Sequence, residues 1–381
     1  MFMTHLGSRR QLRQERKSET FEHNMKHLCE QTDVDTVADT DTLAYFAERM
    51  PREGMERLLA SMTTHLIRTK AFDAFRLYDY FPIAIDGSQI CTFKAEPWPG
   101  CPHRKPKDGP LQYFAYVLDA KLVTPGGMAL TLATEMLTNE GHQEFDKQDC
   151  ELKAFDRLVE KLHRLFPRTP LVLLLDSLYA NQNVIRLIES HRWKYIISFK
   201  EGSMPERFAE VQALMKLQPK NTLLTEWNQA KQAFRWSHQL PIAEFTPNVI
   251  ECREESKEKE ATTFVWLTNF PVCANSVKNI ANKGGRLRWK IENEGFNVQK
   301  NAGYHMEHPF SEHPNGFRVF YLLLLIAHYF SQLIHHGSLI ESLIRVYGSG
   351  KNFARRLAES LRNWLVPADL PRPGQIRFQP P

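Results

Sequence analysis

The sequence predicts a mixed α/β fold that begins with helices and contains a β-rich insertion. Short apolar runs, which are typical of strands, occupy residues 82–85, 112–123, 128–137, 171–175 and 195–199. Apolar residues at helical spacing predict helices at 145–165 and 181–190 between the later runs. The alternating stretch 222–270 follows a helix expected at 203–216, so an insertion of strands is expected there.

The sequence also predicts where strands end and where the remaining helices lie. Gly87 is expected to end the first strand, the turn 125–127 to join the next two, and the charged stretch 251–260 to form a solvated loop. Helical spacing or amphipathic patterning predicts helices at 54–77, 283–300, 316–336 and 350–364, with a Pro-rich tail at 367–381.

Composition is that of a globular protein, and its charge is unevenly distributed. The 381 residues carry a formal net charge of +5, with 42% hydrophobic and 24% charged residues. Basic residues cluster at 1–20, 283–300 and 351–381. Such patches suit a phosphate backbone, although solvated helix faces would have the same composition.

Two compositional features bear on metals, redox compartment and membranes. The six cysteines are scattered without a CxxC pair, which indicates a reducing cytoplasm. Cys91, Cys101 and His103 are close in sequence but lack the fourth ligand that a structural zinc site requires. The most apolar run, 319–327, is too short for a span of about 20 residues, so a buried core helix and no membrane partner are expected.

Two aspartates each close an apolar strand. Asp86 follows Phe81–Ile85, and Asp176 follows Leu171–Leu175. Strand ends are rigid, and carboxylates converging from neighbouring strands can hold hard divalent cations such as Mg²⁺. A single aspartate at a strand end also commonly caps a turn, so this interpretation stays open.

The basic helix supplies a third acid. At 100° per residue, Arg288 and Glu292 lie about 40° apart on one face, whereas Glu294 lies on the opposite side. Apolar residues flank this polar stripe on both sides, which is unusual for a merely solvated helix. The alternative is a simple i,i+4 ion pair.

The order of Asp86, Asp176, a β-rich stretch and Arg288-Trp289-Lys290-Ile291-Glu292 resembles the DDE transposases of bacterial insertion sequences, and in particular the insertion-sequence-four type. The resemblance covers roughly residues 35–335 and implies an RNase H-like mixed sheet with flanking helices, interrupted by the β insertion. It implies that Asp86, Asp176 and Glu292 are both the catalytic residues and the metal ligands.

The resemblance also implies an organisation of the chain. Residues 1–78 would be a helical DNA-end-binding module, 79–202 and 276–345 the two parts of the catalytic core, and 203–275 the β insertion. Residues 346–381 would form a basic C-terminal helix and tail.

The family's helix signature is Tyr, Arg, Glu and Lys at fixed spacing, and this chain departs from it twice. Gly285 stands at the tyrosine position and Gln299 at the lysine position, with Lys300 one residue further on. These departures favour a subfamily or an inactive copy. Candidate DNA-binding residues are Arg288, Lys290 and Lys300, together with Arg104 and Lys105 in a basic loop that could equally be solvated.

The implied reaction needs two Mg²⁺ ions per site, for which Mn²⁺ could substitute. One phosphodiester bond is hydrolysed at each terminal inverted repeat, and the freed 3′-OH attacks target DNA. Pairing two ends implies a homodimer, working in the bacterial cytoplasm at the nucleoid.

The rival interpretations are a catalytically inactive DNA-binding relic and an RNase H-like nuclease without strand transfer. Gly348-Ser-Gly-Lys351 does not match a phosphate-binding GxxxxGK[ST] loop, which excludes nucleotide hydrolysis through that motif.

Overall fold

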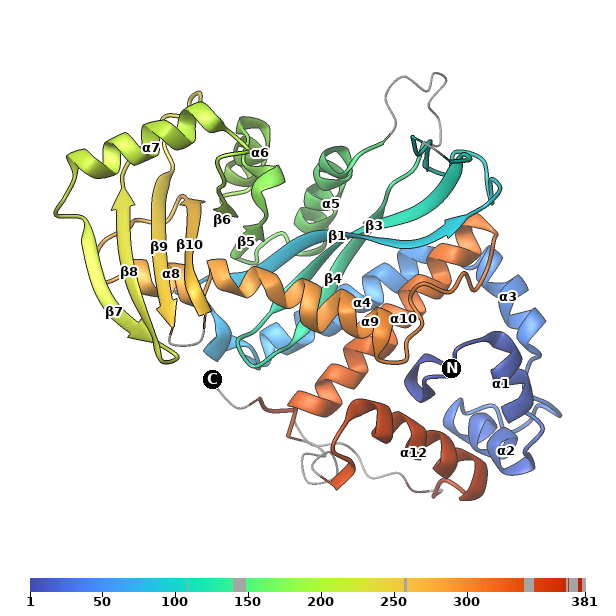
Figure 1. Cartoon of the computed structure of the whole chain (residues 1–381). Coiled ribbons are helices and arrows are strands. Elements are labelled where there is room, and N and C mark those ends of the chain that lie inside the picture. The colour runs from blue at the N-terminus through green and yellow to red at the C-terminus, as the bar shows by residue number, and fades with distance from the viewer. Residues whose placement is uncertain are drawn as a thin grey trace.

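A mixed sheet of ten strands runs through the molecule. Figure 1 shows the helices that surround this sheet. The computed structural model describes residues 1–107, 109–139, 149–256, 259–338, 346–367, 369 and 376–378. The mixed α/β prediction is confirmed. The strands are β1 (Phe81–Phe93), β2 (His103–Arg104), β3 (Gln112–Val123), β4 (Ala129–Met136), β5 (Leu171–Leu175), β6 (Lys194–Ser198), β7 (Thr222–Trp227), β8 (Ala230–Ser237), β9 (Asn248–Ser256) and β10 (Lys259–Thr268).

The strand order places β1 beside β5 in the middle of the sheet. The order is β2-β3-β1-β5-β6-β10-β9-β8-β7, and β4 also pairs with β3. β1, β5 and β6 are parallel neighbours, whereas the other pairings are antiparallel. β5 is fully buried and apolar along its length, as expected for a parallel strand covered on both faces.

The first strand is longer than predicted, because Gly87 does not end it. β1 continues to Phe93, paired with β3 through a register shift between Gln89 and Cys91. Gly87 instead provides space: a Cβ atom there would clash with the hydroxyl group of Tyr116. The glycine is a close-packing position inside the strand, which sequence alone does not distinguish from a turn.

The β-rich stretch forms strands as predicted, but the charged stretch 251–260 is not a solvated loop. Its described residues belong to β9 and β10, which pair antiparallel, and 257–258 lie outside the described residues. Charges in β9 have specific partners: Glu251 accepts from Arg235 at 2.5 Å, and Glu254 from Arg286 at 2.7 Å. β10 also pairs with β6, so the insertion continues the core sheet.

Helices lie on both sides of the sheet. In Figure 1, α5 and α6 are on one side, and α9 and α10 on the other. α5 begins at Glu151, and the earlier start predicted at 145 falls outside the described residues. The helices are α1 (Arg9–Glu15), α2 (Glu19–Leu28), α3 (Thr40–Arg49), α4 (Arg52–Arg68), α5 (Glu151–Leu165), α6 (Gln182–Ser190), α7 (Pro205–Leu217), α8 (Val277–Asn282), α9 (Asn297–Asn301), α10 (Pro314–His336) and α12 (Gly350–Asn363), with short helices η1 (Phe2–Thr4), η2 (Asp73–Phe75) and η4 (Ser177–Tyr179).

The basic segment predicted as one helix at 283–300 consists of three types of helical turn. A 3₁₀ segment, η5 (Gly285–Trp289), leads into a π segment, η6 (Ile291–Phe296), and then into α9. A π turn is wider than an α turn and is frequent at functional sites. Positions after it are therefore rotated away from the faces that a regular 100° step predicts.

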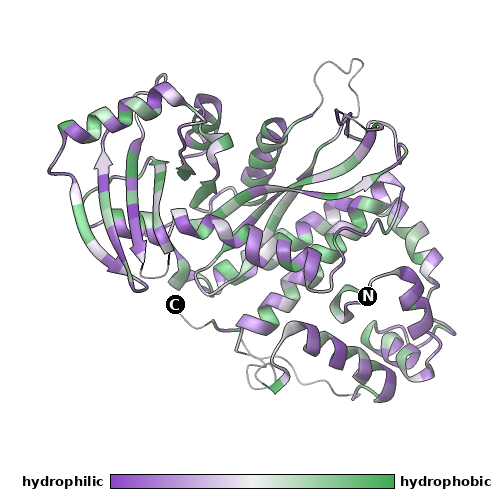
Figure 2. Ribbon diagram, viewed as in Figure 1, coloured by the Kyte–Doolittle hydropathy of each residue, from purple (hydrophilic) through white to green (hydrophobic). Residues whose placement is uncertain are grey.

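Hydrophobic residues concentrate on the central strands, whereas α1 and α12 are largely hydrophilic (Figure 2). α10 is long and apolar enough by composition to cross a membrane, but 72% of its most apolar stretch is buried inside the protein. The expectation of a buried core helix is confirmed. Beneath it, Lys121 and Asp119 form a fully buried ion pair at 2.6 Å, and the Tyr321 hydroxyl donates to Asp119 at 2.9 Å. Buried charges require such partners.

Candidate functional site

Asp86 and Asp176 lie side by side because their strands are parallel neighbours. The register pairs Ala84 of β1 with Leu174 of β5, and two residues further along it places the aspartates level with each other. Asp86 Oδ1 accepts from the Gly87 backbone N–H at 2.9 Å. Asp176 Oδ1 accepts from the Leu178 N–H at 2.8 Å, so Asp176 does cap the turn that follows β5.

Arg288 brings the third acid to the first. Its Nη1 lies 3.0 Å from Asp86 Oδ2 and 2.9 Å from Glu292 Oε1. The Arg288 side chain is only 8% exposed, compared with 15% for Asp86 and 39% for Glu292. The Arg288–Glu292 pair is therefore more than a solvated i,i+4 ion pair, because Arg288 also contacts Asp86 and so connects the helical segment at 285–301 to β1. We call Asp86, Asp176 and Glu292 the acidic site.

The electrostatics of the acidic site reflect crowded negative charge. Burial, followed by the neighbouring Glu292 carboxylate, raises the pKa of Asp86 to about 7, although the Arg288 guanidinium acts in the opposite direction. A second carboxylate nearby disfavours the ionised form of a poorly solvated aspartate such as Asp86. A cation held between them would favour the ionised forms.

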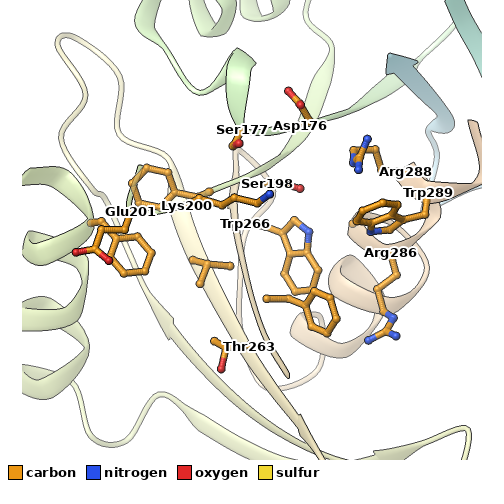
Figure 3. Close-up of a pocket in the computed structure, with 15 residues that line it drawn as sticks. Asp176, Ser177, Ser198, Lys200, Glu201, Thr263, Trp266, Arg286, Arg288 and Trp289 are labelled. Atoms are coloured by element: carbon orange, nitrogen blue, oxygen red, sulfur yellow. The ribbon is translucent and has the colours of Figure 1, made fainter. Parts of the chain in front are cut away.

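A pocket of about 680 Å³ opens beside the acidic site. Figure 3 shows Asp176 and Arg288 at neighbouring parts of its rim, with the indole rings of Trp266 and Trp289 next to them. Trp266 stacks on Phe264 with centroids 5.7 Å apart. Arg288 lies over the Trp289 ring at 4.5 Å, and Trp289 is 49% exposed. The pocket therefore combines aromatic faces with positive charge.

The other predicted DNA-binding residues lie away from the acids. Lys290 pairs with Glu294 at 3.0 Å, and Lys300 with Glu307 at 3.5 Å. Arg104 and Lys105 are exposed at the far end of β3, where Arg104 pairs with Gln112. That position is seven residues from the level of Asp86, or roughly 23 Å at about 3.3 Å per residue. Of the predicted cationic residues, Arg288 is therefore the one at the site.

The two departures from the family signature have local explanations. A Cβ atom at Gly285 would lie 2.5 Å from Trp266 Nε1, so the Trp266 indole occupies the space of a larger side chain. Gln299 is fully buried and contacts His328 Nδ1 at 3.0 Å. Its position faces the core, which excludes a phosphate-binding role for this side chain.

Metal-binding capacity can be judged from the donors. Among the described residues, no group of three or more His, Cys, Asp or Glu side chains is arranged to hold a metal ion as it stands. Cys91 and Cys101 are buried and carry free thiol groups. The acidic site nevertheless has the carboxylate oxygens that Mg²⁺ prefers, and Arg288 serves as the counter-charge for two of them. The donor types suit a divalent cation, but the described residues do not bring three of them around one point.

Several residues at the site were not predicted. Lys200 is exposed, and it lines the pocket together with Arg286 and Trp266. Glu151 accepts hydrogen bonds from the hydroxyl groups of Tyr116 and Tyr179 next to the two aspartates. Only Arg286 carried a signal in the sequence, as a member of the basic cluster at 283–300. The others come from separate elements and show no common spacing.

Three further described acids near the core form ion pairs with basic side chains. Asp149 pairs with Arg157 at 2.6 Å, and Glu135 with Lys161 at 2.8 Å. Asp119 belongs to the buried pair with Lys121, and Glu140 lies outside the described residues. Because the described acids among these are already paired, the acidic site remains the candidate catalytic centre.

The raised pKa of Asp86 predicts a pH-dependent effect of Asp86→Asn on stability. Between about pH 4 and pH 7 the folded state keeps a proton that the unfolded state has lost, so the contribution of Asp86 to stability is present below about pH 4 and lost as the pH rises through 7. At pH 8, Asp86→Asn removes a buried charge and should raise the free energy of unfolding by about 1 kcal/mol or more. Thermal unfolding at pH 8 and pH 4.5 tests this, and an equal change at both pH values would contradict it.

Comparison with known proteins identifies the domain. No curated protein matches the chain. Residues 143–330 match the family model described as transposase DDE domain. The match includes Asp176 and Glu292, whereas Asp86 lies before it and joins the site through its contact with Arg288. With its mixed sheet and flanking helices, the fold is consistent with the RNase H-like architecture of such domains. The chain therefore carries a DDE transposase domain across residues 143–330.

Proposed function

We propose that this protein is a transposase of the insertion-sequence-four type, which cuts DNA at the ends of its own element and joins the freed 3′-OH to target DNA. The observation that carries the proposal is the double contact of Arg288, which binds Glu292 four residues along the chain and Asp86 across 202 residues of sequence. A DDE transposase domain implies DNA cleavage and strand transfer. The arrangement of the acids supports an intact site rather than a relic.

In this proposal Asp86, Asp176 and Glu292 hold two Mg²⁺ ions, with Mn²⁺ as a substitute. The ions supply charge stabilisation at the attacking and leaving oxygens of the phosphodiester. The first reaction is hydrolysis: a water oxygen bonds to phosphorus, the bond from phosphorus to the 3′ oxygen breaks, and a 3′-OH and a 5′-phosphate result. In the second, that 3′-OH forms the new bond to a target phosphorus, and the target's own 3′ oxygen leaves.

The protein's cationic and aromatic residues position the DNA. Arg288 and Arg286 carry guanidinium groups at the pocket, where they can hold phosphate oxygens. Trp289 is exposed beside Arg288 and offers a face on which a nucleobase can stack. Asp176 of the acidic site lines the pocket, and so does Arg288, which contacts the other two acids. A DNA strand bound in the pocket would therefore lie next to the acidic site.

Further parts of the proposal concern assembly and location. Two element ends have to be processed together, which requires at least a homodimer in the active complex. We place the reaction in the bacterial cytoplasm at the nucleoid. Residues 1–78 are the proposed end-binding module, and Lys290, Lys300, Arg104 and Lys105 are proposed to contact DNA outside the acidic site.

Glu292→Gln tests the catalytic assignment. In the presence of Mg²⁺ or Mn²⁺, the wild-type protein should cut duplex DNA carrying the sequences that flank this gene and should join the 3′ ends to a plasmid. Glu292→Gln should lower both activities by about 10²–10³-fold, on the scale of about 2.7–4 kcal/mol for one transition-state contact. Glu294→Gln is the matched control, because Glu294 pairs with Lys290 on the same helix.

The outcomes separate the proposed function from its rivals. Loss of both activities in Glu292→Gln alone supports the transposase. Cleavage by the wild-type protein without joined products indicates a nuclease without strand transfer. End binding without cleavage by any variant indicates a relic, in which case the aspartates are strand-end residues only.

Trp289→Ala tests the role of the pocket. Removing the indole should weaken binding of single-stranded or frayed end DNA by about 1–3 kcal/mol, the range for one stacked base. Trp364→Ala is the control, because Trp364 is 74% exposed in the C-terminal segment, outside the pocket. Fluorescence anisotropy with labelled DNA measures the affinity. Equal loss in both variants would mean that exposed tryptophans bind DNA without regard to the pocket.

A further inference from the structure

We propose that Glu151 is a positioning residue, which fixes the separation of Asp86 and Asp176 through two tyrosines and thereby sets the affinity of the acidic site for divalent cations. This inference rests on the proposed function, because it concerns the same acids. We call Tyr116, Glu151 and Tyr179 the Glu151 bridge.

The Glu151 bridge connects three elements that are separate in the sequence. The Tyr116 hydroxyl of β3 donates to Glu151 Oε2 at 2.6 Å. The Tyr179 hydroxyl of η4 donates to Glu151 Oε1 at 2.7 Å. Each carboxylate oxygen therefore has its own donor, and Glu151 is the first residue of α5. Short hydrogen bonds to an ionised acceptor are stronger than neutral ones.

Each tyrosine belongs to the immediate surroundings of one aspartate. Tyr116 lies against Gly87, the residue after Asp86, and a Cβ atom at Gly87 would clash with its hydroxyl group. Tyr179 is the last residue of η4, the short helix that Asp176 caps. Tyr179 is fully buried and packs on Phe155 of α5 at 4.8 Å, so its ring has little freedom to move.

Electrostatics indicate that the Glu151 bridge and the acids are close. Burial and then Glu151 raise the pKa of Tyr116, and the charges of Asp86 and Asp176 act in the same direction. Burial, Glu151 and the same two aspartates raise the pKa of Tyr179. Both hydroxyl groups therefore keep their protons and remain donors to Glu151.

The physical consequence is a constraint at the point where β1 and β5 stop pairing. β1 and β5 are paired only up to Ala84 and Leu174, so the aspartates lie just past the last backbone pairing between them. The Glu151 bridge connects the elements next to that unpaired end, β3 through Tyr116 and η4 through Tyr179. Without it, η4 loses its hydrogen bond to α5 and keeps only the packing of Tyr179 on Phe155, so the separation of the two carboxylates is less constrained.

Binding of Mn²⁺ alone, measured by titration calorimetry on the full chain, tests the role without depending on activity. Glu151→Gln keeps the shape of the side chain but can accept from only one tyrosine through its single carbonyl oxygen. It should weaken Mn²⁺ binding about tenfold, at the low end of about 10–100-fold for residues that orient ligands. Glu160→Gln, on the same helix but 62% exposed beside His191, should bind Mn²⁺ like the wild type.

Tyr116→Phe and Tyr179→Phe are the second set of variants, and they decide the matter if Glu151→Gln does not fold. Each keeps its ring and Glu151 but removes one hydrogen bond, so each should also weaken Mn²⁺ binding. A purely structural role would lower the melting temperature and leave the Mn²⁺ affinity unchanged, and that result overturns the inference.

The wild type and Asp86→Asn distinguish failure of the inference from failure of the proposed function. Wild-type binding that Asp86→Asn abolishes and Glu151→Gln leaves unchanged overturns the positioning role alone. A wild type that binds no Mn²⁺, or that binds it equally well after Asp86→Asn, contradicts the metal site itself. The positioning role would then be overturned together with the metal site.

Discussion

The contact of one guanidinium group with two carboxylates holds this site together. Arg288 is nearly buried, and its Nη1 lies 3.0 Å from Asp86 and 2.9 Å from Glu292. Without this guanidinium group, the carboxyl groups of Asp86 and Glu292 would face each other with no counter-charge between them. The closing helix can approach β1 because Arg288 supplies the counter-charge.

The rest of the fold places the acids next to the guanidinium group of Arg288. The parallel pairing of β1 and β5 brings Asp86 level with Asp176, and the buried, apolar β5 makes that strand end rigid. The insertion contributes through β10, which pairs with β6 and places Trp266 against Gly285 at the start of η5. The insertion is therefore part of the same sheet and forms a wall of the pocket next to the acids.

Much of this could be predicted from the sequence, because apolar runs and local spacing are local signals. The apolar strand segments that lead to Asp86 and Asp176 and the pairing of Arg288 with Glu292 follow from such signals, whereas the continuation of β1 beyond Gly87 does not. Other features depend on distant partners: the charges of β9 are satisfied by Arg235 and Arg286, so a polar stretch forms a strand. Glu151 meets Tyr116 and Tyr179 only in the folded chain, and the π turn of η6 rotates later positions away from a regular helix.

The most direct test of the central claim is a crystal structure with Mn²⁺ and a DNA end, in which anomalous scattering locates the ions. Our account predicts anomalous peaks within about 2.0–2.6 Å of carboxylate oxygens of Asp86, Asp176 and Glu292, the range for hard divalent cations. It also predicts that Arg288 contacts a phosphate oxygen. Peaks elsewhere, or none with DNA bound in the pocket, would contradict the assignment of these acids as the metal-binding centre.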